Sequence, residues 1–598
     1  MKRASTNFAL PAALTALAAA TLIFAGCTDP LHRIDKKTRR LVELRSDELG
    51  RHTIAPTRTA PVPSFKDRRL NDTDPETTNP PPEELDYQTP SEPRTDRVVA
   101  ERLAGYASYA IGAGPDASGA TPPPPRPVNF NEALRVAQST APEYLFEEEA
   151  YVLDAIAVLS ARNLFRPRFF NETSVQVAGF GREGNYDHVL DIINSLGLTK
   201  NLPSGGSIAA TWIVRATDQL RETVSGGYVQ SSELALSANI PLLRGAGAIA
   251  RENLIQAERN LVYSARDFER SRRELLVQIA NDYFGLLQQQ SGIANIERQL
   301  AGLRQLAEQT AARVDAGRLE PFQRQLSANQ VLTTEARLAG ARESYTLALD
   351  NFKLRLGLPI EIPINILPLD FDLPEPAIEL AEAADRSLAF RLDLQNQRDI
   401  VVDARRAVRN ARNGLLPDLN IAGSVGIPTE ANDPTGGLSI DAEDLNYSLS
   451  ANLGLPLDRR AEHLAVRSSL ILLERSERNL QVSNDRVIIE SRQAVRQIDL
   501  ARFQLELAER GVEINELRLE DLRLRDDTDP QRIVDAENEL IAARNARDQA
   551  RTDLRNAILN YLLDTGQLRV AKDGTLLRLP GMGGTAAASS DDAFPEDG

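Results

Sequence analysis

The sequence contains almost no cysteine, and this scarcity excludes disulfide-stapled folds and thiolate metal clusters. Cys27 is the only cysteine in 598 residues, so neither a disulfide framework nor a cysteine-based metal site can form within one chain. The four histidines lie at positions 32, 52, 188 and 463, without the close spacing that metal ligands show. We therefore expect no metal and no other cofactor.

Motifs of enzymatic chemistry and of nucleic-acid binding are missing as well. The sequence has no GxxxxGK phosphate loop and no nucleophile elbow. A formal net charge of −16 argues against a nucleic-acid partner, because phosphate backbones are bound by basic surfaces. Solvated charge on the surface of long helices accounts for this acidity. An exported hydrolase has almost no residue to support it, and we expect a protein that is not an enzyme.

Long apolar runs are absent after Cys27, but a shorter run precedes it. The chain begins with a basic pair and an apolar stretch that closes with IFAGC, and residues 1–26 therefore predict a secretory signal peptide. The small residues before Cys27 resemble a bacterial lipobox, so we expect this cysteine to carry lipid, palmitate included. A plain export signal with an incidental cysteine is the alternative. No run of 18 apolar residues follows, so an exported chain that crosses a membrane must do so as a β-barrel.

Composition divides the rest of the chain into a tether, two repeats and a tail. Proline-rich residues 27–127 predict an extended, lipidated tether, and residues 569–598 predict a disordered tail. Between them, residues 128–357 and 377–568 are joined by a proline-rich linker at 358–376. The two segments carry the same motifs in the same order: ARNLFRP and ARNGLLP, LSANIPL and LSANLGLPL, ERNL twice, then NFKLRLG and NYLLDTG. These ordered matches indicate an internal duplication.

Each repeat predicts a short helix, strands, a long helix and a second shorter helix. The ranges expected to be helical are 130–165, 250–314, 321–356, 378–414, 459–526 and 530–565. Leu254, Leu261, Phe268 and Leu275 lie seven residues apart, which is typical of the seam of a left-handed coiled coil. A helix of about 65 residues is about 100 Å long, so two shorter helices can stack end to end beside it. An ordinary helical rod explains these heptads equally well.

Strands with one apolar and one polar face point beyond a rod. NYSLSANLGLPL, LNIAGSVGI and LALSANIPL alternate apolar with small or polar residues. SVQVAGF and SIAATWIVRA are less regular candidates inside a repeat-one insertion at 171–233. The residues expected to face lipid are Leu236, Ile240, Leu419, Ile421, Val425, Tyr447, Leu449 and Leu453. A soluble antiparallel sheet with one buried face is the alternative.

The number of predicted strands has a physical consequence. Four or five strands per chain cannot close a barrel, which takes about eight, and an open sheet edge is not tolerated in lipid. Several copies of the chain must therefore share one barrel, with the helices continuing as a tube below it.

At this point the ordered motifs resemble the TolC-type outer-membrane efflux proteins, in their lipoprotein branch. FNEALRVA is similar to the family's opening helix, ARNGLLPDLNIAGSVG to its passage from helix to strand, and ARVDAGRLEPFQRQLSANQVL to its periplasmic helix turn. The resemblance implies a mainly α fold with a small transmembrane β part, in which a homotrimer of duplicated units shares a 12-stranded barrel and a periplasmic α-helical tunnel. It also implies outer-membrane lipid around the barrel, and docking to a periplasmic adaptor (membrane fusion) protein and an inner-membrane pump.

An acidic cluster lies in the helix turn of repeat two. RLRDDTDPQRIVDAE carries Asp526, Asp527, Asp529 and Asp535, and three-fold symmetry would turn each carboxylate into a ring that favours cations at an aperture. The resemblance places gating carboxylates just after this turn, with Asp535 as the nearest match. In the alternative, Asp529 only caps its helix and the others are solvated tip charges.

The function predicted from the sequence is that of an outer-membrane export channel in a tripartite efflux or type I secretion system. It would be a passive conduit, extending into the periplasm, for solutes expelled by the pump. The alternative is a non-channel coiled-coil scaffold lipoprotein of the periplasm, whose strands would form soluble hairpins.

Overall fold

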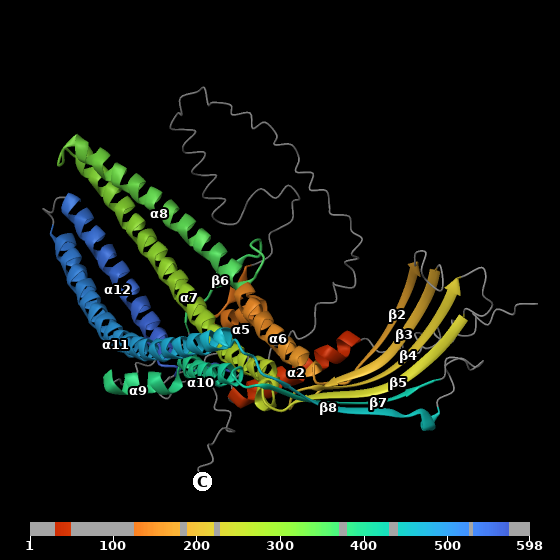
Figure 1. Ribbon diagram of the computed structural model, residues 1–598. Coiled ribbons are helices and arrows are strands. Elements are labelled where there is room, and N and C mark those ends of the chain that lie inside the picture. Colours follow the sequence, from red (N-terminus) through yellow and green to blue (C-terminus); the bar gives the residue numbers. More distant parts are fainter. Residues whose placement is uncertain are drawn as a thin grey trace, which may run out of the picture.

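Long antiparallel helices extend from one end of a curved six-stranded sheet in the computed structural model (Figure 1). It describes residues 30–49, 125–179, 188–220, 228–369, 380–429, 441–525, 530–572 and 574. Cys27 and the turn residues Asp526, Asp527 and Asp529 lie outside this part of the chain.

The heptad patterns form the long helices that they predict. These are α7 (Glu252–Asp315) with its partner α8 (Pro321–Leu356), and α11 (Arg460–Leu524) with its partner α12 (Pro530–Asp564). α8 packs along α7, and α12 packs along both α11 and α7. The α7–α8 turn uses Gly317 at φ 68°, a left-handed conformation that glycine adopts without a Cβ penalty. Pro321 then begins α8, where its missing N–H has no intrahelical partner to lose.

The short helices depart from the prediction, because each predicted segment is split in two. The pairs are α5 (Phe130–Thr140) with α6 (Pro142–Asn163), and α9 (Leu380–Phe390) with α10 (Leu392–Asn413). In the first pair Ala141 is extended at ψ 126°, since Pro142 disfavours a helical conformation in the residue before it. In the second pair Arg391 takes the same role at ψ 122°, and its guanidinium bonds to Asp393 at 2.7 Å.

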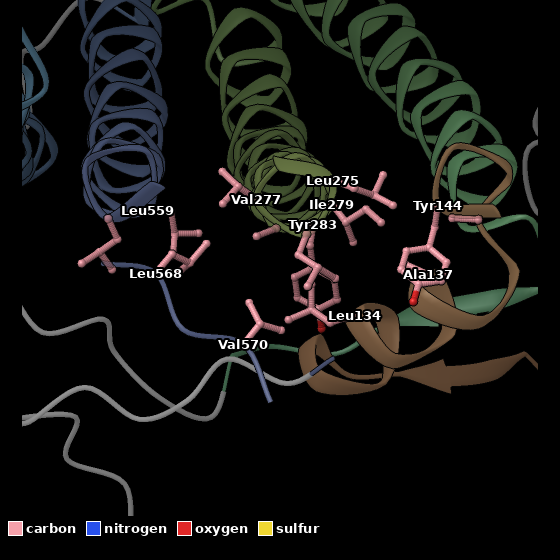
Figure 2. Close-up of a cluster of buried hydrophobic side chains, with 14 of the residues drawn as sticks. Leu134, Ala137, Tyr144, Leu275, Val277, Ile279, Tyr283, Leu559, Leu568 and Val570 are labelled. Carbon is pink, nitrogen blue, oxygen red and sulfur yellow. The ribbon is translucent and has the colours of Figure 1, made fainter. Parts of the chain in front are cut away.

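The main hydrophobic core lies where the short helices meet the middle of α7. Tyr283 and Phe284 of α7 pack against Phe130 of α5, with ring centroids 5.5 Å apart in both pairs. Figure 2 shows Tyr283 and Ile279 of α7 close to Leu134 of α5, with Leu568 and Val570 of the C-terminal segment beside them. The Tyr283 hydroxyl donates to the carbonyl of Leu367 at 2.6 Å. This bond ties α7 to the inter-repeat linker beside the parallel pair β1 (Arg126–Val128) and β6 (Ile364–Ile366).

The sheet contains β2 (Arg168–Gly179), β3 (His188–Asn201), β4 (Ser207–Leu220), β5 (Tyr228–Pro241), β7 (Asp418–Pro428) and β8 (Asn446–Gly454). Its order is β2-β3-β4-β5-β7-β8, and every neighbouring pair is antiparallel. The implied 12-stranded barrel takes four strands from each of three chains, and that count is wrong, since this sheet has six strands among the described residues. Repeat one is the reason, because its insertion adds the hairpin of β3 and β4 between β2 and β5, so that this repeat forms four long strands rather than two.

Both ends of the predicted domain layout also need correction. Residues 30–49, expected to be part of an extended tether, form helix α2 (Pro30–Leu49), which packs on α6 and α7. Its Val42 is fully buried, and the Tyr151 hydroxyl of α6 donates to the Val42 carbonyl at 3.3 Å. At the other end, Val570 is 1% exposed in the core, so the segment just after residue 568 is packed rather than disordered. Helix α2, which is 20 residues long and amphipathic, is stabilised by burial of one face against α6 and α7.

Candidate functional site

The two faces of the sheet differ in chemistry most clearly across β5, β7 and β8. On one face, Val425 pairs with Tyr447 and Leu419 with Leu453 across β7 and β8. The strand β5 continues this face, with Leu236 opposite Val425 and Ile240 opposite Ile421. All eight residues expected to face lipid lie on this one apolar face: Leu236, Ile240, Leu419, Ile421, Val425, Tyr447, Leu449 and Leu453. Tyr447 and Leu449 are 81% and 79% exposed, so nothing in the described chain covers them.

The opposite face is polar and concave. Its register pairs Ser424 with Ser448 and Asn420 with Asn452, and the two serine hydroxyls lie 2.7 Å apart. An open hollow on this side of the sheet is lined mainly by residues of this face: Ser207, Ser237, Asn239, Asn420, Ala422, Ser424, Ser448, Ser450 and Asn452. Small and polar side chains on the inside of a curved sheet leave room for water, as in the lumen of a barrel.

One aromatic side chain interrupts this polar lining. The ring of Phe170 on β2 lies over Gly197 on β3, where an added Cβ would stand 2.3 Å from the Phe170 Cζ. Glycine leaves a gap on the surface of a strand, and an aromatic ring from the neighbouring strand fills it. This pair is not evident from the sequence, because Phe170 and Gly197 lie on neighbouring strands whose register no local pattern fixes.

Each end of the sheet presents a strand edge. β2 pairs only with β3, and β8 only with β7, among the residues that the structure describes. Unpaired N–H and C=O groups along such an edge are a template for another strand. Because the strand number is even, β2 and β8 run in opposite directions, so β8 of one copy can pair antiparallel with β2 of the next.

The helices beneath the sheet repeat this pattern of open ends. α6 packs on α7, α7 on α10 and α10 on α11, in the same order as the strands to which they connect. The outer side of α6 exposes Phe146, Leu153 and Ile156, with Phe146 67% exposed. The outer side of α11 exposes Leu464, Ile471, Leu472, Val482, Ile489, Leu500, Phe503, Leu507, Ile514 and Leu517. Apolar stripes of this length mark interaction surfaces on a folded chain.

At the far tip of the helices, the predicted acidic cluster is only partly within the described chain. Asp535 is exposed on the first turns of α12 and accepts a hydrogen bond from Gln531 Nε2 at 3.0 Å. Asp526, Asp527 and Asp529 lie outside the described residues. No ion pair to Asp535 is formed within the described part of the chain.

Sequence reasoning missed the polar contacts that join the two helix pairs near the tip. Glu537 of α12 is buried and bonds to Arg523 of α11 at 2.5 Å, and its carboxylate lies against Gly302 of α7, 3.0 Å from where a Cβ would be. Higher on α7, Gln299 Nε2 donates to Asn538 Oδ1 at 2.6 Å and Asn295 Nδ2 donates to Asn545 Oδ1 at 2.8 Å. The sequence does carry a signal for these contacts, because polar residues at or next to heptad positions often specify which helices pair.

A second polar cluster lies in the middle of the molecule, between α7, the α9–α10 break and the end of α12. Arg391 forms ion pairs with Asp393 and Glu490, and Arg270 forms one with Asp393. The nearby Asp564 has no direct share in these pairs. Burial raises the pKa of its carboxyl from 3.8 to about 6, although the positive charge of Arg391 opposes the shift.

The described residues hold neither a metal-binding cluster nor an apolar helix of membrane-spanning length. They contain no group of three or more histidine, cysteine or acidic residues arranged to hold a metal ion. None of the described helices is long and apolar enough to cross a membrane.

Comparison with solved structures identifies the architecture. The outer membrane channel CmeC of Campylobacter jejuni superposes with a TM-score of 0.57 at 13% sequence identity, over 73% of this chain and 85% of that one. The chain has the fold of the TolC-type outer-membrane channels. No family model and no curated relative matches the sequence.

Two other solved channels agree with this assignment. The outer membrane protein VceC of Vibrio cholerae gives a TM-score of 0.57 at 14% identity, over 73% of this chain and 96% of that chain. The open state of the MtrE outer membrane channel of Neisseria gonorrhoeae gives 0.56 at 14% identity, over 74% and 90%. At such low identity the likeness establishes the fold, and the predicted fold class of long helices with antiparallel strands is confirmed.

Proposed function

We propose that this chain forms the outer-membrane export channel of a tripartite efflux or type I secretion system. The observation that carries the proposal is that the folded chain is an arc with two complementary open ends. One end presents the edge of β2 above the apolar stripe of α6, and the other presents the edge of β8 above the apolar stripe of α11. A single chain leaves both strand edges and both stripes uncovered.

A head-to-tail ring of identical chains covers both ends at once, because each open end meets its complement. Three copies, the number that the family resemblance implies, bring six strands each and make 18 in all. Barrel diameter grows roughly in proportion to strand number, so this barrel is about one and a half times as wide as a 12-stranded one. The proposed homotrimer is therefore wider at the outer membrane than the sequence analysis expected.

The environment of the proposed barrel follows from its two faces. The apolar face, with Tyr447 and Leu449, meets the lipid of the outer membrane. Contact with lipid removes from water the apolar side chains that a single chain leaves exposed. The polar, concave face lines an aqueous lumen. The paired helices α7–α8 and α11–α12 extend from this barrel into the periplasm as a tunnel.

The proposed transport is passive, and its energy comes from partners. An inner-membrane pump expels the solute, and a periplasmic adaptor connects that pump to the far tip of the helices. Asp526, Asp527, Asp529 and Asp535 form the proposed aperture of that tip, where three-fold repetition makes rings of carboxylates. The ion pair of Arg523 with Glu537 lies just above it and holds α11 to α12.

A lipid anchor at Cys27 is proposed in addition. α2 runs antiparallel to α6, since its second half meets Tyr151 while its first half lies toward the sheet. The first residue of α2, Pro30, is three positions after Cys27, so the acyl chains would enter the membrane beside the base of the barrel. One acyl chain holds a protein only weakly, and the barrel supplies the main attachment.

Fractionation of cells that make the full chain tests the proposal. We expect a heat-modifiable oligomer that leaves outer membranes only with detergent, and the same behaviour for Cys27→Ser. A non-channel scaffold would instead be released into buffer by Cys27→Ser, because its lipid would be its only membrane attachment. That release would overturn the channel proposal.

A further inference from the structure

A groove between α2 and α6 combines an apolar floor with a basic rim. Its lining residues are Ile34, Lys37, Arg40, Leu41, Leu44, Ile156, Leu159, Ser160, Arg162, Asn163 and Arg166. Leu44 is 56% exposed and Ile156 is 41% exposed, although both belong to the floor. The groove is therefore open and apolar, and in a single chain its exposed aliphatic side chains are in unfavourable contact with water.

The charged residues that line this groove are all basic. No acidic residue lines it, while Lys37, Arg40 and Arg166 form no ion pair with any residue that the structure describes. Arg162 differs, because it is neutralised by Glu258 of α7 at 2.7 Å. Three unpaired cations beside exposed aliphatic side chains suit a ligand with an anionic head and a hydrocarbon chain.

The position of the groove indicates where a ligand of this kind would come from. It extends to Arg166, two residues before the first residue of β2, Arg168, and α2 lies at this junction of helices and sheet (Figure 1). Phe169, the first apolar-face residue of β2, follows Arg166 by three positions along the chain and is 71% exposed. In the proposed channel this is the level at which lipid headgroups of the periplasmic leaflet meet the protein.

In the proposed ring, the neighbouring chain brings more basic than acidic side chains toward this groove. The start of α11 from the next copy approaches this groove. Residues 458–467 carry Arg459, Arg460 and Arg467 against Asp458 and Glu462. Glu462 already pairs with Arg244 at 3.9 Å. Two basic surfaces would repel each other, so the neighbour closes the groove more readily when an anion lies between them.

We propose that this groove binds one anionic phospholipid per chain, and the inference rests on the proposed function for its membrane level. One acyl chain lies along Ile34, Leu44 and Ile156, and the phosphate lies between Lys37, Arg40 and Arg166. The lipid then acts as a wedge at the seam between copies, joining α2 of one chain to α11 of the next.

Native mass spectrometry of the full-length protein tests this directly. The detergent-purified oligomer is stripped of lipid and exposed to equal amounts of phosphatidylglycerol and phosphatidylcholine with matched acyl chains. We expect retention of phosphatidylglycerol at least tenfold above phosphatidylcholine, at one lipid per chain. Lys37→Gln with Arg40→Gln should abolish this preference.

Arg33→Gln with Lys36→Gln is the matched control, because it removes the same charge from exposed positions of α2 outside the groove lining. Equal retention of the two lipids by the wild type, or equal losses in the two double variants, would overturn the proposal. Oligomer mass and conductance are read on the same samples. An oligomeric, conducting protein without lipid preference refutes the groove alone, whereas a monomer refutes the channel itself.

Discussion

The aromatic ring of Phe170 covers Gly197 on the polar, concave face of the sheet, in the place where any larger residue would put its Cβ. This contact joins the edge strand β2 to the inserted hairpin of β3 and β4. In the proposed ring of copies the edge of β2 pairs with the next chain, so we expect its attachment to β3 to affect both folding and assembly.

Substitution of Gly197 should weaken this attachment. Gly197→Ala places a Cβ 2.3 Å from the Phe170 ring, so the ring must rotate away, at a cost of about 1–3 kcal/mol typical of overpacking. We expect a lower midpoint for heat dissociation of the oligomer on gels. Gly423→Ala is the control, because its Cβ meets only ordinary contacts at 3.7 Å, and Phe170→Ala should relieve most of the penalty in the double variant.

Removal of tip carboxylates should alter conduction if they form the aperture. Asp535→Ala with Asp527→Ala is expected to raise single-channel conductance and to reduce preference for cations, because it deletes two rings of negative charge. The measurement is conductance and reversal potential in planar bilayers. Asp553→Ala is the control: Gln549 donates to Asp553 at 2.8 Å, as Gln531 does to Asp535, but farther along α12 from the tip. Unchanged currents in the double variant would remove these residues from the gate.

The buried carboxylate of Glu537 should depend on its arginine. Arg523→Gln leaves this carboxylate, 8% exposed, without its charged partner, at a cost of about 1–3 kcal/mol. Hydrogen exchange of nearby α12 amides should then be about 5- to 150-fold faster. Arg525→Gln serves as the control, since its partner Asp521 is exposed and exposed pairs contribute about 0–1 kcal/mol. Equal exchange in both variants would contradict a structural role for the Arg523–Glu537 pair.

Asp564 predicts a pH dependence of stability with a definite sign. Its pKa rises from 3.8 to about 6 on folding because the carboxyl is buried, so the folded state holds the proton more tightly than the unfolded state. The stability from this group is complete below pH 3.8 and is lost as the pH rises through about 6. Asp564→Asn should therefore be more stable than the wild type at pH 7 and should flatten this part of the curve. Thermal unfolding between pH 3.5 and 7.5 in detergent gives the comparison, and parallel curves would refute it.

Much of the helical architecture could be predicted because it depends on local periodicity. The long helices expected at 250–314 and 459–526 were found at Glu252–Asp315 and Arg460–Leu524. Seven-residue spacing needs no knowledge of the partner helix. The breaks at Ala141 and Arg391 were missed, although Pro142 gave a signal for the first.

The inserted strands could not be predicted in the same way, because their pattern is completed by distant residues. In β3 the alternation of Ile192, Leu196 and Leu198 is interrupted by Asn194 on the same face. Its amide donates to Asn171 and Thr173 of β2, at 2.7 Å in both cases. A polar residue satisfied across strands looks, from sequence alone, like the end of a strand. Helix α2 was not predicted for a related reason: its stability depends on burial against α6 and α7, which are distant in the sequence.

The acidic tip marks the limit of prediction for the candidate site. Charge clusters at Asp526, Asp527 and Asp529 are visible in the sequence, whereas the buried pair of Arg523 and Glu537 depends on how two helices face each other. The faces of the strands were easier to predict than these helix contacts, because side chains alternate between the two faces of any strand.

Single-channel recording of the purified full-length protein in planar bilayers tests the central claim most directly. If copies of this arc close into a shared barrel with a water-filled lumen, the protein must produce discrete, stable conductance steps from a species of several chains. Insertion as a single chain, with no current above that of the empty bilayer, would contradict the account.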